Sequence, residues 1–387
     1  MSEVPSNNRP TVLSVDLDAV VRNAHALSRH ASGRPLLAVV KSNAYGMGAI
    51  PVAKALSEKA AAWLGVALVE EGIQLRRAGI EAPILMVGPA GPEQAADLLS
   101  SRVTPAIYSL VFLEAVEEAC AKVGRKTEVH IKLDSGMGRL GFRPEEIPGL
   151  LKALRSARHL IVQGIFSNLA SADDPKSPQT AEQLAVFQDQ VDRIRKEGHE
   201  PQWVHLANSS ALLAHPSTHL SLCRPGLALY GIKPSRVLPG DDLEPAVSFK
   251  TSVIQLKDVP AGTPIGYSAT YRAPRRMLVG ILPLGYADGL PRCLQDKGCV
   301  LVHGVRRSII GRVSMDLAAV DLSGEGPVRE GDAVTLWGRD GEDSLSPWDW
   351  AVWSGTIPYE VMTGVGCRVA RRYAFEGRTW IEQPLMH

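Results

Sequence analysis

The chain has 387 residues, a length that suits two domains better than a single core. With 45% apolar residues, 21% charged residues and a net charge of +1, it is expected to be a soluble globular protein. This balance argues against binding to nucleic acid or to an anionic membrane, so small molecules and further copies of the chain are the expected partners. The N-terminus lacks the layout of a signal peptide, and no apolar run approaches a membrane span of about 20 residues, which favours a cytoplasmic location.

The cysteines are scattered, with no Cys-x-x-Cys pair and no Cys/His spacing typical of zinc. We therefore expect reduced thiols that mostly fill the core, and no metal site. The five are Cys120, Cys223, Cys293, Cys299 and Cys367.

The first predicted element is an alternating run at residues 11–17, which could pair with the second domain. Apolar strand-like runs then alternate with segments of helical periodicity as far as residue 230. The predicted strands are residues 36–41, 63–67, 83–87, 103–107, 128–134, 160–166, 203–206 and 222–230. The predicted helices are residues 50–61, 91–99, 110–122, 145–156 and 180–197. Repeated βα units predict an α/β fold, a (β/α)8 TIM-like barrel. An open doubly wound sheet is the alternative, but the first strand is not followed by Gly-x-Gly-x-x-Gly.

The pattern changes after residue 240 to short alternating runs without long helices, which predicts a C-terminal β-rich domain. These runs are residues 247–259, 276–282, 299–302, 308–320 and 332–336. The turn-forming segment 239–242 is the expected linker, so we divide the chain into a barrel at 1–240 and a β domain at 241–387.

The most informative segment is the apolar run that ends on Lys41 and continues into the small-residue turn 42–48. A buried strand would place this amine at its rim, where desolvation lowers the pKa of the ammonium group. A lysine of that kind can act as a base or form a Schiff base. The alternative is a solvated lysine just beyond a strand end.

Two further strand ends carry cationic side chains. Arg139 projects from the glycine-rich segment 134–142, either to bind a carboxylate or as a solvated side chain. Lys132 alternates with apolar neighbours and is predicted to point inward, which is costly unless a carboxylate or a modification neutralises it. Arg224 lies in apolar sequence in the eighth strand and therefore needs a specific acceptor.

Asn208 and Ser209 follow the seventh strand and precede a helix-like run. They can either cap that helix or help its first N–H groups to bind a phosphate, and these readings stay open. In the second domain, polar and aromatic clusters lie near strand ends at residues 266–271, 311–316 and 357–360. Each could simply be a turn with a packed tyrosine, but their combination with the barrel residues favours a functional site.

Together these motifs resemble the alanine racemases, which are pyridoxal-phosphate enzymes with an N-terminal (β/α)8 barrel and a C-terminal β domain. The similar segments occur in the family's order and spacing over most of the chain. They are residues 39–48, 134–142, 205–210, 224–231, 266–271, 285–289, 311–316 and 358–360.

The resemblance implies two catalytic bases. Lys41 corresponds to the lysine that forms a Schiff base with pyridoxal 5'-phosphate and also moves a proton. Tyr267 corresponds to the base on the opposite face, which the second subunit of a homodimer supplies in this family. Bases on both faces allow the α-proton to leave either enantiomer and return to the other side, and the cofactor stabilises the deprotonated carbon. The implied reaction interconverts L-alanine and D-alanine, which supplies D-alanine for cell-wall peptidoglycan.

The resemblance also implies the remaining site residues. Arg224 corresponds to the arginine that faces the pyridine nitrogen, and Lys132 to a lysine that is carbamylated in some members. The implied substrate-binding residues are Arg139 and Met315, which hold the carboxylate, together with Asp316 and Tyr286 near the entry. The other implied cofactor-binding residues are Tyr45, Asn208, Ser209, Gly226, Leu227 and Tyr359.

Some positions depart from the family pattern. Asn168 stands where most relatives have a histidine that hydrogen-bonds the arginine, and Met47 and the segment 361–366 also vary. A racemase for a larger amino acid such as serine is therefore an alternative. A decarboxylase or aldolase of the same barrel family is another, since it would need no opposite-face tyrosine. A non-catalytic cofactor carrier is disfavoured by the large second domain.

Overall fold

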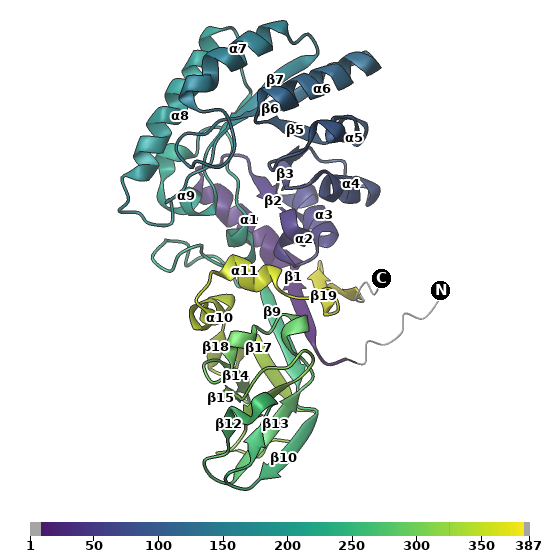
Figure 1. The fold of residues 1–387 in the computed structure, drawn as a ribbon, viewed down its shortest axis with the longest axis vertical. Helices are drawn as coiled ribbons and strands as arrows, with labels where there is room; N and C mark the ends of the chain where they lie inside the picture. The colour runs from purple at the N-terminus through teal and green to yellow at the C-terminus, as the bar shows by residue number, and fades with distance from the viewer. Residues whose placement is uncertain (1–8, 325, 383–387) are drawn as a thin grey trace. The chain divides into compact units, whose positions relative to one another are not determined.

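The computed structural model describes residues 9–324 and 326–382. By their internal contacts these residues form two compact units (Figure 1). The first, here called the barrel unit, comprises residues 19–44 and 49–244. The second, here called the β unit, contains residues up to Asp18, residues 45–48 and the chain from Pro245 onward.

Seven parallel strands form the sheet of the barrel unit in their order along the chain. They are β2 (Leu37–Val39), β3 (Trp63–Val66), β4 (Ile84–Met86), β5 (Thr104–Ile107), β6 (Thr127–Lys132), β7 (Leu160–Phe166) and β8 (Trp203–His205). Every residue of β2, β3 and β4 is buried, as expected for parallel strands covered on both faces. The carboxyl ends of all seven strands therefore lie at the same end of the sheet, where the predicted site residues follow them.

A short segment closes this sheet into a barrel. Cys223 pairs with Leu36 beside the first strand, and Arg224 pairs with Asn208 beyond the last. The predicted strand at 222–230 is wrong beyond this point, because residues Leu227–Tyr230 form a 3₁₀ helix. Pro225 explains the early end, since proline has no N–H with which to continue the ladder. The architecture is nonetheless the predicted (β/α)8 type.

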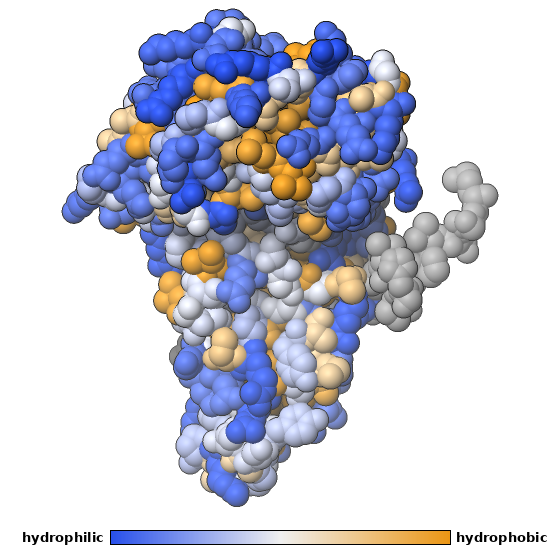
Figure 2. All heavy atoms as spheres, turned by 45° about the horizontal axis from the view of Figure 1, so that its top comes forward, coloured by the Kyte–Doolittle hydropathy of each residue, from blue (hydrophilic) through white to orange (hydrophobic). Residues whose placement is uncertain are grey.

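Helices surround the strands of this unit (Figure 1). They are α1 (Leu17–His30), α3 (Ala49–Lys59), α4 (Val69–Arg77), α5 (Ala95–Ser100), α6 (Leu110–Val123), α7 (Ile147–Ser156), α8 (Gln179–Lys196) and α9 (Ser209–Ala214). Helices α1 and α4 are additional to the predicted ones. Figure 2 shows that the face of this unit in view is largely hydrophilic with apolar patches between the polar side chains, as expected for amphipathic helices. No helix in the described ranges is both long and apolar enough to cross a membrane.

The β unit contains a large mixed sheet with the strand order β10-β13-β16-β15-β14-β17-β9-β1-β19-β20, and β18 pairs with β17. Its strands are β1 (Val12–Asp16), β9 (Val247–Ser252), β10 (Gln255–Val259), β13 (Met277–Leu282), β14 (Cys299–Val302), β15 (Val305–Ile310), β16 (Ala318–Asp321), β17 (Ala333–Asp340), β18 (Asp343–Leu345), β19 (Ala370–Phe375) and β20 (Arg378–Glu382). Strands β11 (Pro264–Ile265) and β12 (Tyr271–Arg272) form a separate pair, and the helices α10 (Pro347–Ser354) and α11 (Pro358–Thr363) complete the unit.

Strand β1 lies inside this large sheet, parallel to β19 and antiparallel to β9. The cysteines form no disulfide, but only Cys120 and Cys223 are buried. Cys293 and Cys367 are exposed, so the expectation that the thiols mostly fill the core is wrong for them.

Candidate functional site

Lys41 directly follows β2, at the carboxyl end of the barrel strands. The chain before it is held in the sheet, because the Val40 N–H donates to the Gly65 oxygen at 2.8 Å. Burial lowers the pKa of the Lys41 ammonium, the positive charge of Arg139 lowers it further, and Glu71 opposes the change. A larger fraction of this amine is therefore neutral at neutral pH than for a surface lysine, as a nucleophile or base requires.

The turn that follows this lysine has an unusual backbone. Ser42, Asn43 and Ala44 all have left-handed dihedral angles, with φ between 53° and 54°. Such a conformation costs roughly 1–2 kcal/mol per residue, so neighbouring contacts must hold it. Glu71 accepts the Ser42 N–H at 2.6 Å, and the Asn43 side chain accepts the Ala49 N–H at 2.7 Å. Glu71 also accepts from Ala67 and Leu68 after β3, which joins the ends of two neighbouring strands.

Lys132 ends β6 and points inward as predicted, with its amine 4.3 Å from the centre of the Phe166 ring. Burial is the main cause that lowers the pKa of this lysine to about 7, and the cations Arg224 and Arg139 add to it. Asp134 opposes the change only in part, since its own carboxylate already accepts three N–H groups of the loop at residues 136–138. Lys132 therefore lacks a full counter-charge.

The loop after β6 returns to its own strand at Gly141. The Phe142 N–H donates to the Lys132 oxygen at 3.0 Å, and a Cβ atom at Gly141 would lie 2.8 Å from that same oxygen. With φ at +117°, only glycine fits this approach. The return leaves Arg139 exposed on the loop, without an ion pair to any residue that the structure describes. Its five donors are available to an anionic ligand.

Arg224 is buried, and its guanidinium group is hydrogen-bonded to residues that follow two neighbouring strands, β7 and β8. Nη2 donates to the Ser167 oxygen at 2.6 Å, to the Leu206 oxygen at 3.0 Å and to Asn168 Oδ1 at 3.3 Å. Asn168 thus provides an acceptor although it replaces the expected histidine. Burial lowers the pKa of Arg224 to about 10, so the group keeps its charge at neutral pH. No described residue accepts from Nε, which leaves this N–H for a ligand.

Two buried histidines, His205 and His130, continue the chain of polar contacts that begins at Arg224. Its Nη1 lies 3.1 Å from His205 Nδ1, and His205 Nε2 lies 2.9 Å from His130 Nδ1. Burial, together with the nearby arginine, lowers the pKa of His205 well below its usual value. Burial lowers that of His130 to about 3, so both rings are neutral. Because arginine only donates, His205 carries its proton on Nε2 and His130 on its own Nε2, which faces Gln163 Oε1 at 3.4 Å.

The next strand end brings together the predicted phosphate-side residues of the barrel unit. Asn208 caps α9 by accepting the Ala211 N–H at 3.1 Å. The hydroxyl oxygen of the buried Ser209 accepts the Gly226 N–H at 2.8 Å, and the 3₁₀ helix begins directly afterwards at the buried Leu227. The capping reading is therefore correct for Asn208, whereas Ser209 can still donate its hydroxyl proton to a ligand.

The remaining predicted residues belong to the β unit. The rings of Tyr45 and Tyr359 lie 5.9 Å apart, and burial followed by the neighbouring Tyr359 raises the pKa of Tyr45 above its usual range. Tyr267 is 69% exposed and Met315 is 52% exposed. Tyr286 is 44% exposed and donates its N–H to the Ser314 oxygen at 3.0 Å, which places it beside the segment of Met315.

A tight turn presents the side chain of Tyr267. Gly266, Ser268 and Ala269 around it all have positive φ. Arg312 braces the turn by donating from Nη1 to Ser268 Oγ at 2.9 Å. The residue before Arg312 must be glycine, because a Cβ atom at Gly311 would lie 2.7 Å from the backbone oxygen of Ile265. Neighbouring backbone therefore holds an otherwise unfavourable conformation.

Within the barrel unit, the structure gathers an excess of positive charge. Arg224, Arg139 and Lys41 all lower the pKa of Lys132, and loop N–H groups already engage the Asp134 carboxylate. This donor set fits a ligand that carries a phosphate and a substrate that carries a carboxylate. The sequence patterns did not identify three residues that hold this group in place. Phe166 packs against Lys132, His205 accepts from Arg224, and Glu71 holds the turn after Lys41. A glutamate in an ordinary helical run, such as Glu71 in α4, carries no sequence signal of this role.

The fold and this group define a class of protein: a (β/α)8 barrel with a lysine of lowered pKa among other cationic side chains at the carboxyl ends of its strands, joined in one chain to a β-rich domain. Residues 15–234 match the family model "Alanine racemase, N-terminal domain", and residues 246–373 match "Alanine racemase, C-terminal domain". The chain belongs to the alanine racemase family.

Individual relatives agree with this assignment. The chain is 41% identical to an alanine racemase of Symbiobacterium thermophilum over 372 residues, covering 95% of this chain and 98% of the relative. The structure of alanine racemase from Bacillus anthracis with bound L-Ala-P has a TM-score of 0.91 at 37% identity, covering 97% of this chain and 98% of that one. The alanine racemase of Bartonella henselae with covalently bound pyridoxal phosphate has a TM-score of 0.87 at 29% identity, covering 94% and 99%.

Proposed function

We propose that this protein is an alanine racemase that interconverts L-alanine and D-alanine with pyridoxal 5'-phosphate. The observation that carries the proposal is the lowered pKa of Lys41, an amine at the carboxyl end of the barrel strands within an excess of cationic side chains. Family membership over nearly the whole chain supports the reaction. The bound cofactor would supply a conjugated ring that stabilises negative charge on the substrate α-carbon.

In this proposal the barrel unit holds the cofactor. Lys41 binds it covalently through Nζ and acts as one base. Arg224 directs its Nε–H to the ring nitrogen and keeps a positive charge there, which disfavours protonation of that nitrogen. The phosphate contacts come from the side chains of Tyr45, Ser209 and Tyr359 and from the backbone at Gly226 and Leu227, with Asn208 holding the adjoining helix start.

The other groups hold the substrate and move its second proton. Arg139 and the Met315 N–H bind the carboxylate, and Tyr286 and Asp316 shape the entry. Tyr267 acts as the base on the opposite face, in agreement with a two-base reaction. Its 69% exposure supports a partner subunit that covers it, so we propose a homodimer with shared sites. The proposed setting is the cytoplasm, and the proposed role is D-alanine supply for peptidoglycan.

We expect Lys132 to add carbon dioxide reversibly. Its neutral amine would attack the carbon atom and lose a proton, leaving a carbamate that offsets the charges of Arg139 and Arg224. Because the pKa of this lysine is about 7, the neutral fraction rises with pH through that value. The carbamate signal in ¹³C NMR with labelled bicarbonate should therefore grow from acidic to alkaline pH. It should vanish in Lys132→Met and persist when the exposed Lys126 is changed to Met; a signal that falls with rising pH would contradict the assignment.

The activity itself can be tested with single amino acids. We expect the purified holoenzyme to convert L-alanine to an equal mixture of enantiomers, as measured by chiral chromatography. Comparable conversion of L-serine would make the enzyme a broader racemase. Release of carbon dioxide and an amine without any D-amino acid would instead identify a decarboxylase and overturn the proposal.

A further inference from the structure

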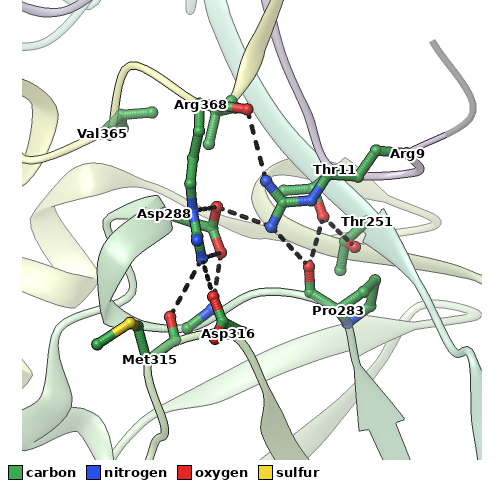
Figure 3. A network of polar contacts seen from close by, with 12 residues as sticks. Arg9, Thr11, Thr251, Pro283, Asp288, Met315, Asp316, Val365 and Arg368 are labelled. Carbon is green, nitrogen blue, oxygen red and sulfur yellow. Dashed lines mark hydrogen bonds and ion pairs between the residues drawn. The ribbon is translucent and has the colours of Figure 1, made fainter. Parts of the chain in front are cut away.

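Asp288 is a buried carboxylate at the centre of a polar network in the β unit (Figure 3). Its side chain is fully buried, yet it accepts four donors. Arg368 approaches with two nitrogens, Nε at 2.8 Å from Oδ1 and Nη2 at 3.0 Å from Oδ2. The Gly285 N–H donates to Oδ2 at 3.0 Å, and Arg9 Nη2 lies 2.7 Å from Oδ1.

This carboxylate stays charged despite its burial. Burial alone would raise the pKa of Asp288, but the hydrogen bonds from Arg368, Gly285 and Arg9 hold the pKa below its usual range. A buried charge of this kind holds its donors in place, because losing a donor leaves the buried carboxylate less compensated. Asp288 therefore locks the turn at Tyr286–Asp288 to Arg368.

Arg368 connects the buried carboxylate to the segment 314–316. The nitrogen Nη2 that binds Asp288 also lies 2.7 Å from Asp316 Oδ1 and donates to the Met315 oxygen at 3.3 Å (Figure 3). The Ala287 N–H donates to the same Met315 oxygen at 3.1 Å. Two donors to one carbonyl thus set the orientation of the peptide that follows Met315.

The peptide that precedes Met315 is fixed as well. Its carbonyl oxygen, that of Ser314, accepts the Tyr286 N–H at 3.0 Å. In a trans peptide the N–H points opposite to the carbonyl, so the Met315 N–H points away from the turn. No acceptor for this N–H lies among the residues described, which leaves it for a ligand.

We propose that Asp288 and Arg368 are positioning residues for the substrate carboxylate. Together they hold the Met315 N–H in its outward direction. Arg368 also neutralises Asp316, whose exposed carboxylate would otherwise repel a carboxylate bound at that N–H. The inference rests on the proposed function for the identity of the substrate, but the binding of a carboxylate can be measured without turnover.

The test compares two arginines that bind the same buried carboxylate. Arg368→Gln should raise the KM for alanine, and the Kd for propionate measured by calorimetry on the holoenzyme, by about 10–100-fold, the usual effect of losing a hydrogen bond to a charged group. The kcat should change far less. Arg368→Lys should restore part of the affinity, because lysine keeps the charge beside Asp316.

Arg9→Gln is the matched control: Arg9 binds the same carboxylate, Asp288, and donates to the backbone oxygens of Pro283 and Arg368. It should lower the unfolding temperature but leave KM and the propionate Kd unchanged. Adding Asp316→Asn to Arg368→Gln should recover part of the lost propionate affinity by removing the repulsion.

Equal weakening of propionate binding by Arg9→Gln and Arg368→Gln would overturn the proposal, because the network would then be only structural. Unchanged propionate binding in Arg368→Gln would overturn it too, as would a wild-type holoenzyme that does not bind propionate. A wild type that binds propionate, loses this binding on Arg368→Gln and yet does not racemise alanine would overturn the proposed reaction and leave this inference standing.

Discussion

The Lys41→Ala variant is expected to lose covalent attachment of pyridoxal 5'-phosphate and at least about 10⁴-fold in kcat/KM for alanine, the upper range for removing a general base. The amine owes its reactivity to its place after β2, where burial and Arg139 lower its pKa. The other lysine of this group, Lys132 at the end of β6, lies instead against the ring of Phe166 on β7. The loss should therefore affect both attachment and proton transfer.

Attachment can be measured without any assay of activity. Borohydride reduces a carbon–nitrogen double bond to a permanent link, so after denaturation the wild type should keep the cofactor and Lys41→Ala should not. Lys54→Ala, which changes an exposed lysine on α3, is the matched control and should behave as the wild type. The unfolding temperature of the apoprotein should not fall, since the variant removes a desolvated amine. Cofactor retained by Lys41→Ala would exclude this lysine as the attachment point.

The Tyr267→Phe variant is expected to keep the attached cofactor and lose about 10²–10⁴-fold in racemisation, the usual contribution of a positioned base. Its phenol lies on a braced turn of the β unit and is 69% exposed, so replacing it should not disturb the fold. The two enantiomers have equal free energies, so kcat/KM must fall by the same factor in both directions. A difference between the two enantiomers can therefore appear only in how fast each exchanges its α-hydrogen with solvent.

We assign Tyr267 to L-alanine and Lys41 to D-alanine. In deuterium oxide, the variant should therefore still exchange the α-hydrogen of D-alanine without forming L-alanine, because Lys41 remains. Exchange into L-alanine should be lost. NMR of the α-hydrogen measures both, and Tyr271→Phe, which removes a hydroxyl that contacts Met277 on the same stretch of chain, is the control. Equal exchange of both enantiomers by Tyr267→Phe would reject the assignment of this tyrosine as the second base.

The barrel was largely predictable because its elements are set by local patterns. All seven sheet strands, β2 to β8, lie in runs that the sequence shows directly, and α6 is capped by Ser109 at its start and Gly124 at its end, both ordinary boundary signals. The eighth strand was the exception. Its apolar character continues through Tyr230, but Pro225 ends the pairing and the chain turns into a 3₁₀ helix.

The candidate site was predictable only at positions where a single charged side chain stands in, or at the end of, an apolar run. Lys41 ends an apolar run, Lys132 interrupts one and Arg224 lies within one, so each signals a buried cation from sequence alone. The partners of these cations give no such signal. The acceptors of Arg224 come from Ser167 and Leu206, at the ends of two different strands, and only closure of the barrel brings them together.

The sequence by itself therefore determined the strands, the cationic residues at their ends and, through its motifs, the family. The tertiary structure alone decided how those residues are held. Glu71 reaches the turn after Lys41 across 29 positions of chain, and Arg368 reaches Asp288 across 80. Periodicity and turn residues act over a few neighbours, whereas these polar contacts form only after sheet pairing has brought distant segments together and excluded water from them.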